Sequence, residues 1–214
     1  MKRNFSLLLI VLVAAVAVSS QVRPPTPRGS QKATVSQTLG TTEVSVTYSR
    51  PAIFGRKVYG DWPKPTSGEA TLDNGNDRPK DAPLVPWGHI WRTGANEATL
   101  FSVNDDVLIN GQPLAAGKYS LHTIPGKDGE WTIIFNSDEG QWGSFSYDSK
   151  KDVLRVKAKA EWLAASTELL TFGIDPDVPA KLGDVASKGT VVLRWEKLRL
   201  PFTVEVKDMV GSTL

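Results

Sequence analysis

The fold class follows from Val107-Leu108-Ile109-Asn110-Gly111-Gln112-Pro113-Leu114, where Asn-Gly lies between two apolar segments. The two central residues of a type I′ turn need positive φ angles, which Asn and Gly adopt most readily, so this pattern predicts a β-hairpin. The segment that begins at Thr42 supports the same class. Its residues Val44, Val46 and Tyr48 alternate with polar residues, as in a strand with one buried face.

Further strands are predicted where β-branched and aromatic residues lie between Gly, Pro, Asn or Asp. Pro201 indicates that its strand is an edge strand, or that the proline is among the strand's first residues. No segment indicates a long helix. We therefore expect an all-β antiparallel sandwich of about ten strands, with a partly open β-barrel as the alternative. The further strands are predicted over residues 33–39, 118–124, 130–136, 153–160, 167–174, 190–196 and 200–206.

The N-terminus is predicted to be a secretory signal peptide. Lys2 and Arg3 precede an apolar run over residues 7–18, and small and polar residues follow it. This run is shorter than the roughly 20 residues that span a bilayer, although an uncleaved anchor is an alternative. We expect a periplasmic or secreted protein that has no stable membrane insertion after cleavage.

The rest of the chain is expected to form one domain. Cleavage after Ala17 and cleavage after Ser20 both fit the pattern, so residues 1–20 are assigned to the signal peptide. Residues 21–32 are rich in proline and are expected to form an extended tether. Residues 33–214 then form a single sandwich domain with a long loop insertion at 61–83, which is either a surface loop or a lid.

Composition excludes several classes of partner and site. The chain has no cysteine, so it has neither a disulfide framework nor a thiolate metal site. It contains 25 Lys and Arg and 23 Asp and Glu residues, and removal of Lys2 and Arg3 leaves equal numbers of both signs. Because nucleic-acid binding requires a concentrated positive face, we expect no nucleic-acid partner.

Residues 87–99 follow neither a helical nor a strand period, although they include aromatic, cationic, amide and acidic side chains. Arg92, Asn96 and Glu97 are candidate ligand-binding residues. Trp87 and Trp91 offer an aromatic wall for a sugar or a flat organic ligand. The alternative is structural: a tight turn, an ion pair between Arg92 and Glu97, and tryptophans in the core.

Two arginines follow the strand that begins at Thr42. Arg50 and Arg56 lie at its end and in the next turn, where guanidinium groups can clamp a carboxylate or a phosphate. The alternative is a pair of ordinary salt-bridged arginines, with Glu97 or Asp148 as partners.

His89 and His122 are the only histidines, and neither belongs to a zinc-binding spacing. We expect no metal site and no cofactor. Glu97 is a candidate general acid or base, with His122 or Asp148 as its helper, which would make the protein a hydrolase. The chain contains no nucleophile elbow, phosphate-binding loop, dinucleotide fingerprint or calcium loop to support an enzyme class.

Several motifs spread over most of the mature chain resemble the exported bacterial family called domain of unknown function 2911. The resemblance implies a secreted or periplasmic domain with no established activity. The most specific of these motifs is Trp91-Arg92-Thr93-Gly94-Ala95-Asn96-Glu97-Ala98-Thr99. The others include Val46-Thr47-Tyr48-Ser49-Arg50-Pro51, Gly55-Arg56-Lys57, Ala116-Gly117-Lys118-Tyr119-Ser120-Leu121, Trp131-Thr132-Ile133-Ile134-Phe135-Asn136, Trp142-Gly143 and Asp152-Val153-Leu154-Arg155-Val156.

Together these observations favour an exported module that binds a small polar or anionic ligand or a partner. A hydrolase that uses Glu97, and a purely structural role for the motif, remain the alternatives. The predicted binding residues are Arg50, Arg56, Trp91, Arg92, Asn96, Glu97 and His122.

Overall fold

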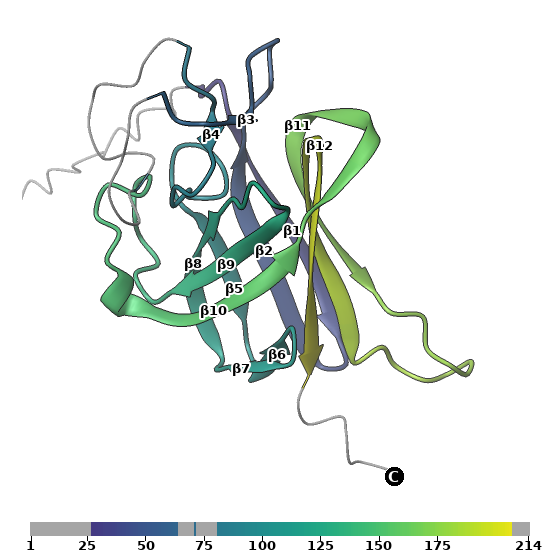
Figure 1. Cartoon of the computed structure of the whole chain (residues 1–214). Coiled ribbons are helices and arrows are strands. Elements are labelled where there is room, and N and C mark those ends of the chain that lie inside the picture. The colour runs from purple at the N-terminus through teal and green to yellow at the C-terminus, as the bar shows by residue number, and fades with distance from the viewer. Residues whose placement is uncertain (1–26, 64–70, 72–80, 207–214) are drawn as a thin grey trace, which may run out of the picture.

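Two antiparallel sheets make up most of the computed structural model, which describes residues 27–63, 71 and 81–206 (Figure 1). The predicted signal peptide and most of the insertion predicted at 61–83 lie outside the described residues. Neither sheet closes on itself, so the architecture is the predicted antiparallel sandwich rather than the barrel. No helix in the described ranges is long and apolar enough to cross a membrane.

The larger sheet has six strands in the order β1-β2-β5-β8-β9-β10, and every neighbouring pair is antiparallel. A short 3-10 helix, η1 (Ser149–Lys151), precedes its last strand. The six strands are β1 (Gln31–Leu39), β2 (Thr42–Arg50), β5 (Thr99–Val103), β8 (Gly117–Ile124), β9 (Glu130–Asn136) and β10 (Asp152–Lys159).

The smaller sheet has the order β11-β12-β6-β7, and its long β11–β12 ribbon lies across the larger sheet (Figure 1). Its strands are β11 (Glu161–Pro176), β12 (Lys188–Val206), β6 (Val107–Ile109) and β7 (Gln112–Leu114). Two very short strands, β3 (Tyr59–Gly60) and β4 (Val85–Pro86), pair in parallel near the curled end of the ribbon.

The predicted Asn-Gly hairpin is confirmed. β6 and β7 pair across Asn110 and Gly111, whose φ angles are 46° and 80°. The Asn110 side chain also links the two sheets: its Nδ2 donates to the carbonyl of Lys157 in β10 at 2.9 Å, and its Oδ1 accepts from the backbone N–H of Thr203 in β12 at 2.7 Å. The turn thus sets both the local register and the position of one sheet on the other.

The two last predicted strands, 190–196 and 200–206, are one continuous strand, β12. The expectation that Pro201 marks an edge or a strand start is therefore wrong, since β12 is an inner strand of its sheet. Pro201 is tolerated because it lies between the last pair with β11, at Arg199, and the first pair with β6, at Val204. At that position no neighbouring strand needs its missing N–H.

The inner faces of both sheets meet in one apolar core. Val44 and Val46 of β2 are fully buried, as their alternation predicts. Phe101 of β5 packs edge to face on Phe135 of β9 at 5.1 Å, and both rings lie about 6 Å from Phe202 of β12. Burial of each such side chain contributes about 1.5–3 kcal/mol, so this cluster is a major link between the sheets.

Gly111→Ala is expected to destabilise the protein by about 1 kcal/mol, because alanine is strained at a φ of 80°. Chemical denaturation measures the change. Gly140→Ala is the matched control, since Gly140 has open space around its Cα and no positive φ. Equal stability of the two variants would contradict the assigned turn.

Candidate functional site

Residues 87–99 form an irregular segment that leads from β4 to β5, and we call it the Trp91 segment. Trp91 exchanges two backbone hydrogen bonds with Thr123 of β8, at 2.8 and 2.9 Å. Thr93 has a φ of 55°, which is strained for a β-branched residue, and its carbonyl accepts from the Thr99 hydroxyl at 2.9 Å. A Cβ on Gly94 would lie 3.2 Å from a backbone oxygen of β2. The local sequence therefore meets the demands of a tight, buried turn.

Trp91, predicted as a stacking face for a ligand, lies in the core with 2% of its surface exposed. Its ring stacks on Trp195 of β12 at 5.9 Å, and its indole N–H donates to the carbonyl of Gly94 at 3.1 Å. Arg92 is partly buried, and its carbonyl accepts from the backbone N–H of Thr99 at 3.1 Å. The Trp91 ring therefore joins the Trp91 segment to the smaller sheet and has almost no surface exposed to solvent.

Glu97 pairs with Arg28, a residue of the segment predicted to be a tether. Arg28 Nη1 lies 2.5 Å from Glu97 Oε1, and the guanidinium lies over the Trp142 ring at 5.2 Å. The hydrogen bond from Arg28 lowers the pKa of Glu97 and outweighs the opposing effect of desolvation. Glu97 is therefore ionised at neutral pH, which suits an acceptor or a base but not a general acid.

Asn96 supports the same contact between the N-terminal segment and the Trp91 segment. It has a φ of 59°, and its Nδ2 donates to the carbonyl of Ser30 at 3.0 Å. Its own carbonyl accepts from the backbone N–H of Gly143 at 3.0 Å. The Asn96 side chain thus binds the N-terminal segment, and its backbone carbonyl binds the loop that contains Gly143.

The two predicted arginines lie in different environments. Arg50 donates from Nε to the carbonyl of Leu170 and from Nη2 to the hydroxyl of Thr171, which ties β2 to β11. Arg56 is exposed, and its Nε and Nη2 donate to the carbonyls of Ile53 and Ala52 at 3.0 and 2.6 Å. Arg50 holds the fold, whereas Arg56 is a fixed cation at the surface.

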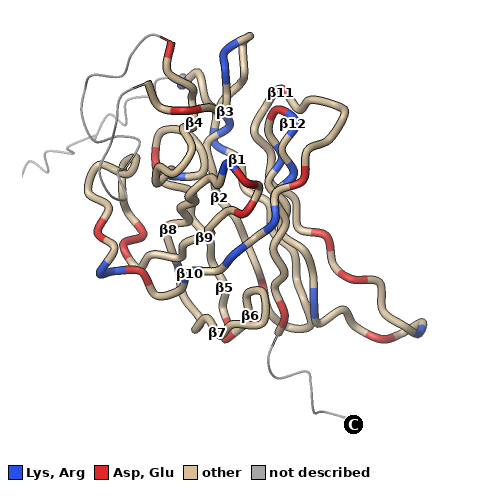
Figure 2. Tube along the Cα trace, viewed as in Figure 1, with Lys and Arg blue, Asp and Glu red and all other residues tan. Residues whose placement is uncertain are grey.

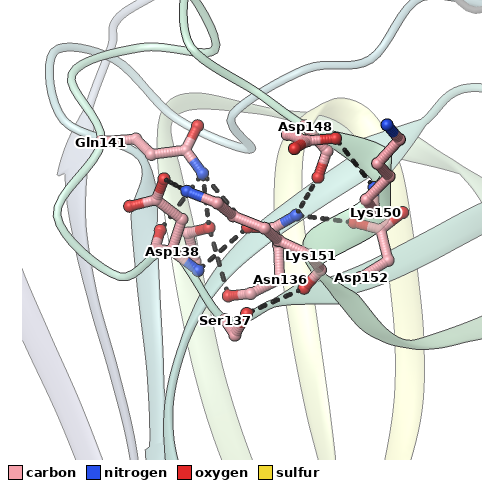
Figure 3. A network of polar contacts seen from close by, with 9 residues as sticks. Asn136, Ser137, Asp138, Gln141, Asp148, Lys150, Lys151 and Asp152 are labelled. Carbon is pink, nitrogen blue, oxygen red and sulfur yellow. Dashed lines mark hydrogen bonds and ion pairs between the residues drawn. The ribbon is translucent and has the colours of Figure 1, made fainter.

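Asp148 belongs to a polar network that links β9, β10 and the loop between them (Figure 3). His122 lies beside this network, next to Tyr147. His122 is fully buried, and its ring packs edge-on against Tyr147 at 5.0 Å. Asp148 caps the short helix η1 by accepting from the backbone N–H of Lys150 at 3.0 Å. Glu97 lines a small cavity between β1, β2 and the loop after β9, and neither His122 nor Asp148 is among the residues that line it.

The centre of this network is Asp152, whose side chain is only 7% exposed. Its carboxylate accepts from the Tyr147 hydroxyl, Arg155 Nε and Asn136 Nδ2, each at 2.7 Å. Burial, with Asp152 as a second cause, raises the pKa of Tyr147 and keeps its hydroxyl a donor. Three donors on one buried carboxylate make a structural anchor.

No three His, Asp or Glu side chains of the described ranges converge as metal ligands would.

A cleft of about 560 Å³ lies between the curled end of the β11–β12 ribbon and the chain that leads into β3. We call it the aromatic cleft. Its chemically distinctive lining residues are the aromatics Tyr59, Trp87 and Trp162, the cations Arg56 and Lys57, and the carboxylates Glu168 and Glu196.

Three aromatic rings form one wall of the aromatic cleft. Tyr59 stacks on Trp87 at 5.7 Å with an interplanar angle of 19°. Trp162 packs edge-on to both rings, at 5.5 and 6.2 Å, and 50% of its surface stays exposed. Burial raises the pKa of Tyr59 well above its usual value, and the nearby Glu196 carboxylate raises it further. The wall therefore combines a neutral phenol with a half-exposed indole.

The strand irregularities of the ribbon create this cleft. The pairing of β11 with β12 shifts between Trp162 and Thr167, so residues 163–166 bulge outward. Opposite them, Glu196 has a φ of 54° and accepts from the next backbone N–H at 2.7 Å. Glu168 accepts from the backbone N–H of Phe54 at 2.9 Å, which fixes the turn on the other side of the cleft.

Of the residues predicted to contact a ligand, Arg56 and Trp87, the second tryptophan of the predicted aromatic wall, border the aromatic cleft. Trp162, Glu168 and Glu196 were not predicted. Trp162 lies between the predicted strands 153–160 and 167–174. A large aromatic residue outside every predicted strand was the one sequence feature that could have indicated a ligand-binding role for it. No local pattern marks Glu196, because its position depends on an irregularity shared by two strands.

The chain belongs to the family described as "Protein of unknown function (DUF2911)", whose model matches residues 30–204. This match confirms the resemblance drawn from the sequence motifs, and it assigns no activity. Comparisons with curated proteins and with solved structures find no significant match.

Arg28→Gln is expected to raise the pKa of Glu97 toward its ordinary value of 4.5, because the variant removes the main cause of the shift. By linkage, the stabilisation from a lowered pKa is present above pH 4.5 and is lost as the pH falls through the folded-state pKa. NMR titration of the Glu97 carboxyl carbon measures the shift. Lys157→Gln, which removes an exposed cation that pairs elsewhere, should leave this titration unchanged. An identical Glu97 titration in both variants would contradict the ion pair.

Asp152→Asn is expected to lower the free energy of unfolding by about 2–3 kcal/mol, because it leaves buried donors without their charged acceptor. Thermal and urea unfolding measure the loss. Asp184→Asn, at an exposed loop position, should change stability by less than about 0.5 kcal/mol. A small loss for Asp152→Asn would mean that the network contributes little to stability.

Proposed function

We propose that this member of the DUF2911 family is an exported protein that binds a small neutral polyhydroxy ligand, such as a saccharide, in the aromatic cleft. The observation that carries the proposal is the half-exposed Trp162 beside Tyr59 and Trp87 in a cleft of about 560 Å³. Ligand sites typically combine such a volume and an aromatic wall with a few placed polar groups.

The aromatic wall suits a sugar ring. The face of an aromatic ring carries partial negative charge and attracts the weakly positive C–H groups on the flat side of a saccharide. Trp162 is 50% exposed although it packs edge-on against Tyr59 and Trp87, so its position is fixed while part of its surface is still available. A fixed aromatic ring loses little conformational entropy when a ligand binds.

The charges favour a neutral ligand over an anionic one. Two cations, Arg56 and Lys57, are balanced by two carboxylates, Glu168 and Glu196, at the same cleft. Hydroxyl groups can donate to carboxylates and accept from a guanidinium or an ammonium group, whereas an anion would be repelled by the carboxylates. A neutral polyhydroxy ligand therefore fits the charges of this cleft better than an anionic ligand does.

Several of these polar groups are held in place before any ligand arrives. Two backbone carbonyls hold the Arg56 guanidinium, and Glu168 holds the backbone of Phe54. Glu196 has a left-handed backbone conformation, and strain of this kind concentrates at functional sites. Preorganisation lowers the entropic cost of binding.

The N-terminal pattern of Lys2, Arg3 and an apolar run supports export to the periplasm or beyond. Lys and Arg are interspersed with Asp and Glu along the described trace (Figure 2), which supports the expectation of no nucleic-acid partner. The proposed ligand also suits an exported protein, because saccharides are common outside the cytoplasm.

The hydrolase alternative has less support. Glu97 has a lowered pKa, and its candidate helpers His122 and Asp148 do not border its cavity. The contacts of Trp91 and Asn96 instead favour a structural role for most of the Trp91 segment.

Trp162→Ala is expected to weaken saccharide binding about tenfold or more, because it removes the exposed part of the stacking wall. Isothermal titration with the best binder from a panel of neutral oligosaccharides and matching uronates measures the effect. We expect neutral members to bind more tightly than the uronates.

The matched control is Trp142→Ala, because Trp142 is 52% exposed and does not line the aromatic cleft. This variant should leave saccharide affinity unchanged. The proposal fails if no panel member binds, or if Trp142→Ala and Trp162→Ala weaken binding equally.

A further inference from the structure

A second cavity, of about 140 Å³, lies between β1, β2 and the loop that follows β9. We call it the Gln141 cavity. It differs from the aromatic cleft in that two of its lining residues carry a buried oxygen acceptor for which the described part of the chain supplies no hydrogen-bond donor. The residues on which the argument depends are Lys32, Tyr48, Glu97, Leu100, Glu139 and Gln141.

The first of these acceptors is the side-chain carbonyl of Gln141, a residue only 4% exposed. Its Nε2 donates to Asn136 Oδ1 and to the carbonyl of Asp138, both at 3.2 Å, and these bonds fix which end of the amide is nitrogen. Oε1 accepts no hydrogen bond from the described residues. Figure 3 shows this oxygen directed away from the network that holds the nitrogen.

The second acceptor is Oε2 of Glu97. The other oxygen of this carboxylate, Oε1, accepts from Arg28, whereas Oε2 is buried and accepts from no other residue of the described ranges. A contact with its own backbone N–H also lowers the pKa of the Glu97 carboxyl. A buried acceptor that lacks a donor costs about 1–3 kcal/mol, and more when it is charged. Two such acceptors on one cavity are an unusual feature that a bound donor would relieve.

We propose that the Gln141 cavity binds a small organic ammonium compound, whose N–H groups donate to Glu97 Oε2 and Gln141 Oε1. A primary ammonium has three donors and no acceptor, which matches two acceptors that themselves cannot donate. Glu139 is exposed and lines the same cavity, where it adds a second negative charge. The acceptor set therefore selects a cation over a neutral donor.

The remaining lining residues fit a short apolar body. Tyr48 and Leu100 contribute ring and aliphatic surface, and a cavity of about 150 Å³ holds a molecule the size of benzene. The exposed Lys32 borders the same space and could meet a carboxylate on the ligand. The ligand is thus a simple amine or an amino acid, and both share the ammonium group.

The test is isothermal titration of the mature protein with n-butylammonium chloride and with n-butanol, which has the same carbon chain without the charge. We expect the ammonium compound to bind about tenfold or more tightly than the alcohol. L-norvaline, an amino acid with a propyl side chain, distinguishes the two sources: tighter binding than n-butylammonium indicates an amino acid, and weaker binding a simple amine. Equal affinity for the alcohol and n-butylammonium, or no binding of n-butylammonium, overturns the proposal.

Variants then locate the site. Glu97→Gln keeps the shape of the side chain but removes its charge and replaces an acceptor by a donor, so n-butylammonium affinity should fall about tenfold or more. Arg28→Gln removes a competing cation and should leave affinity equal or higher. Glu43→Gln, at an exposed position of β2, is the matched control and should have no effect. Unchanged affinity in Glu97→Gln overturns the assignment, while circular dichroism confirms that each variant is folded.

Discussion

The stack of Trp91 on Trp195 is the contact on which the rest of the structure depends. Trp91 is bonded through its backbone to Thr123 of the larger sheet, whereas Trp195 belongs to β12 of the smaller sheet. The buried pair therefore fixes how the β11–β12 ribbon sits on the sandwich. It also explains why the Trp91 segment accepts strained residues such as Thr93, since a large aromatic burial outweighs strain of about 1–2 kcal/mol.

The aromatic cleft is a consequence of this stack. Trp195 points into the core, and the next residue, Glu196, takes a left-handed conformation that turns its carboxylate toward the cleft side. β11 compensates with the bulge at 163–166, which leaves Trp162 half exposed beside Tyr59. An irregularity that would weaken a plain ribbon thus produces a concave surface with aromatic and charged lining residues.

Local patterns predicted the elements well, because alternation and turn chemistry act over a few residues. The hairpin at Asn110 and the buried face of β2 are examples. The partners of long-range contacts were not predictable in the same way. Glu97 pairs with Arg28, which lies 69 residues away in the sequence, and Asn110 bonds to both β10 and β12. No rule of residue spacing predicts either contact. Continuity of β12 through Pro201 likewise depends on which neighbours pair on each side.

Contacts within the fold account for much of the density of the Trp91 segment, although its two ends, Trp87 and Glu97, also line cavities. A segment with several positive φ angles needs Gly, Asn or strongly bonded residues, and a buried indole needs an acceptor, which Gly94 supplies to Trp91. Such residues look like a binding site in sequence because the same polar groups serve both purposes. The side chains on which the two proposed sites depend are dispersed: Trp162 is 50% exposed against 2% for Trp91, and Gln141 and Glu97 line a different cavity and carry buried acceptors that no other described residue satisfies. The two proposed sites therefore depend on exposed aromatic surface and unmet hydrogen-bonding capacity rather than on local residue density.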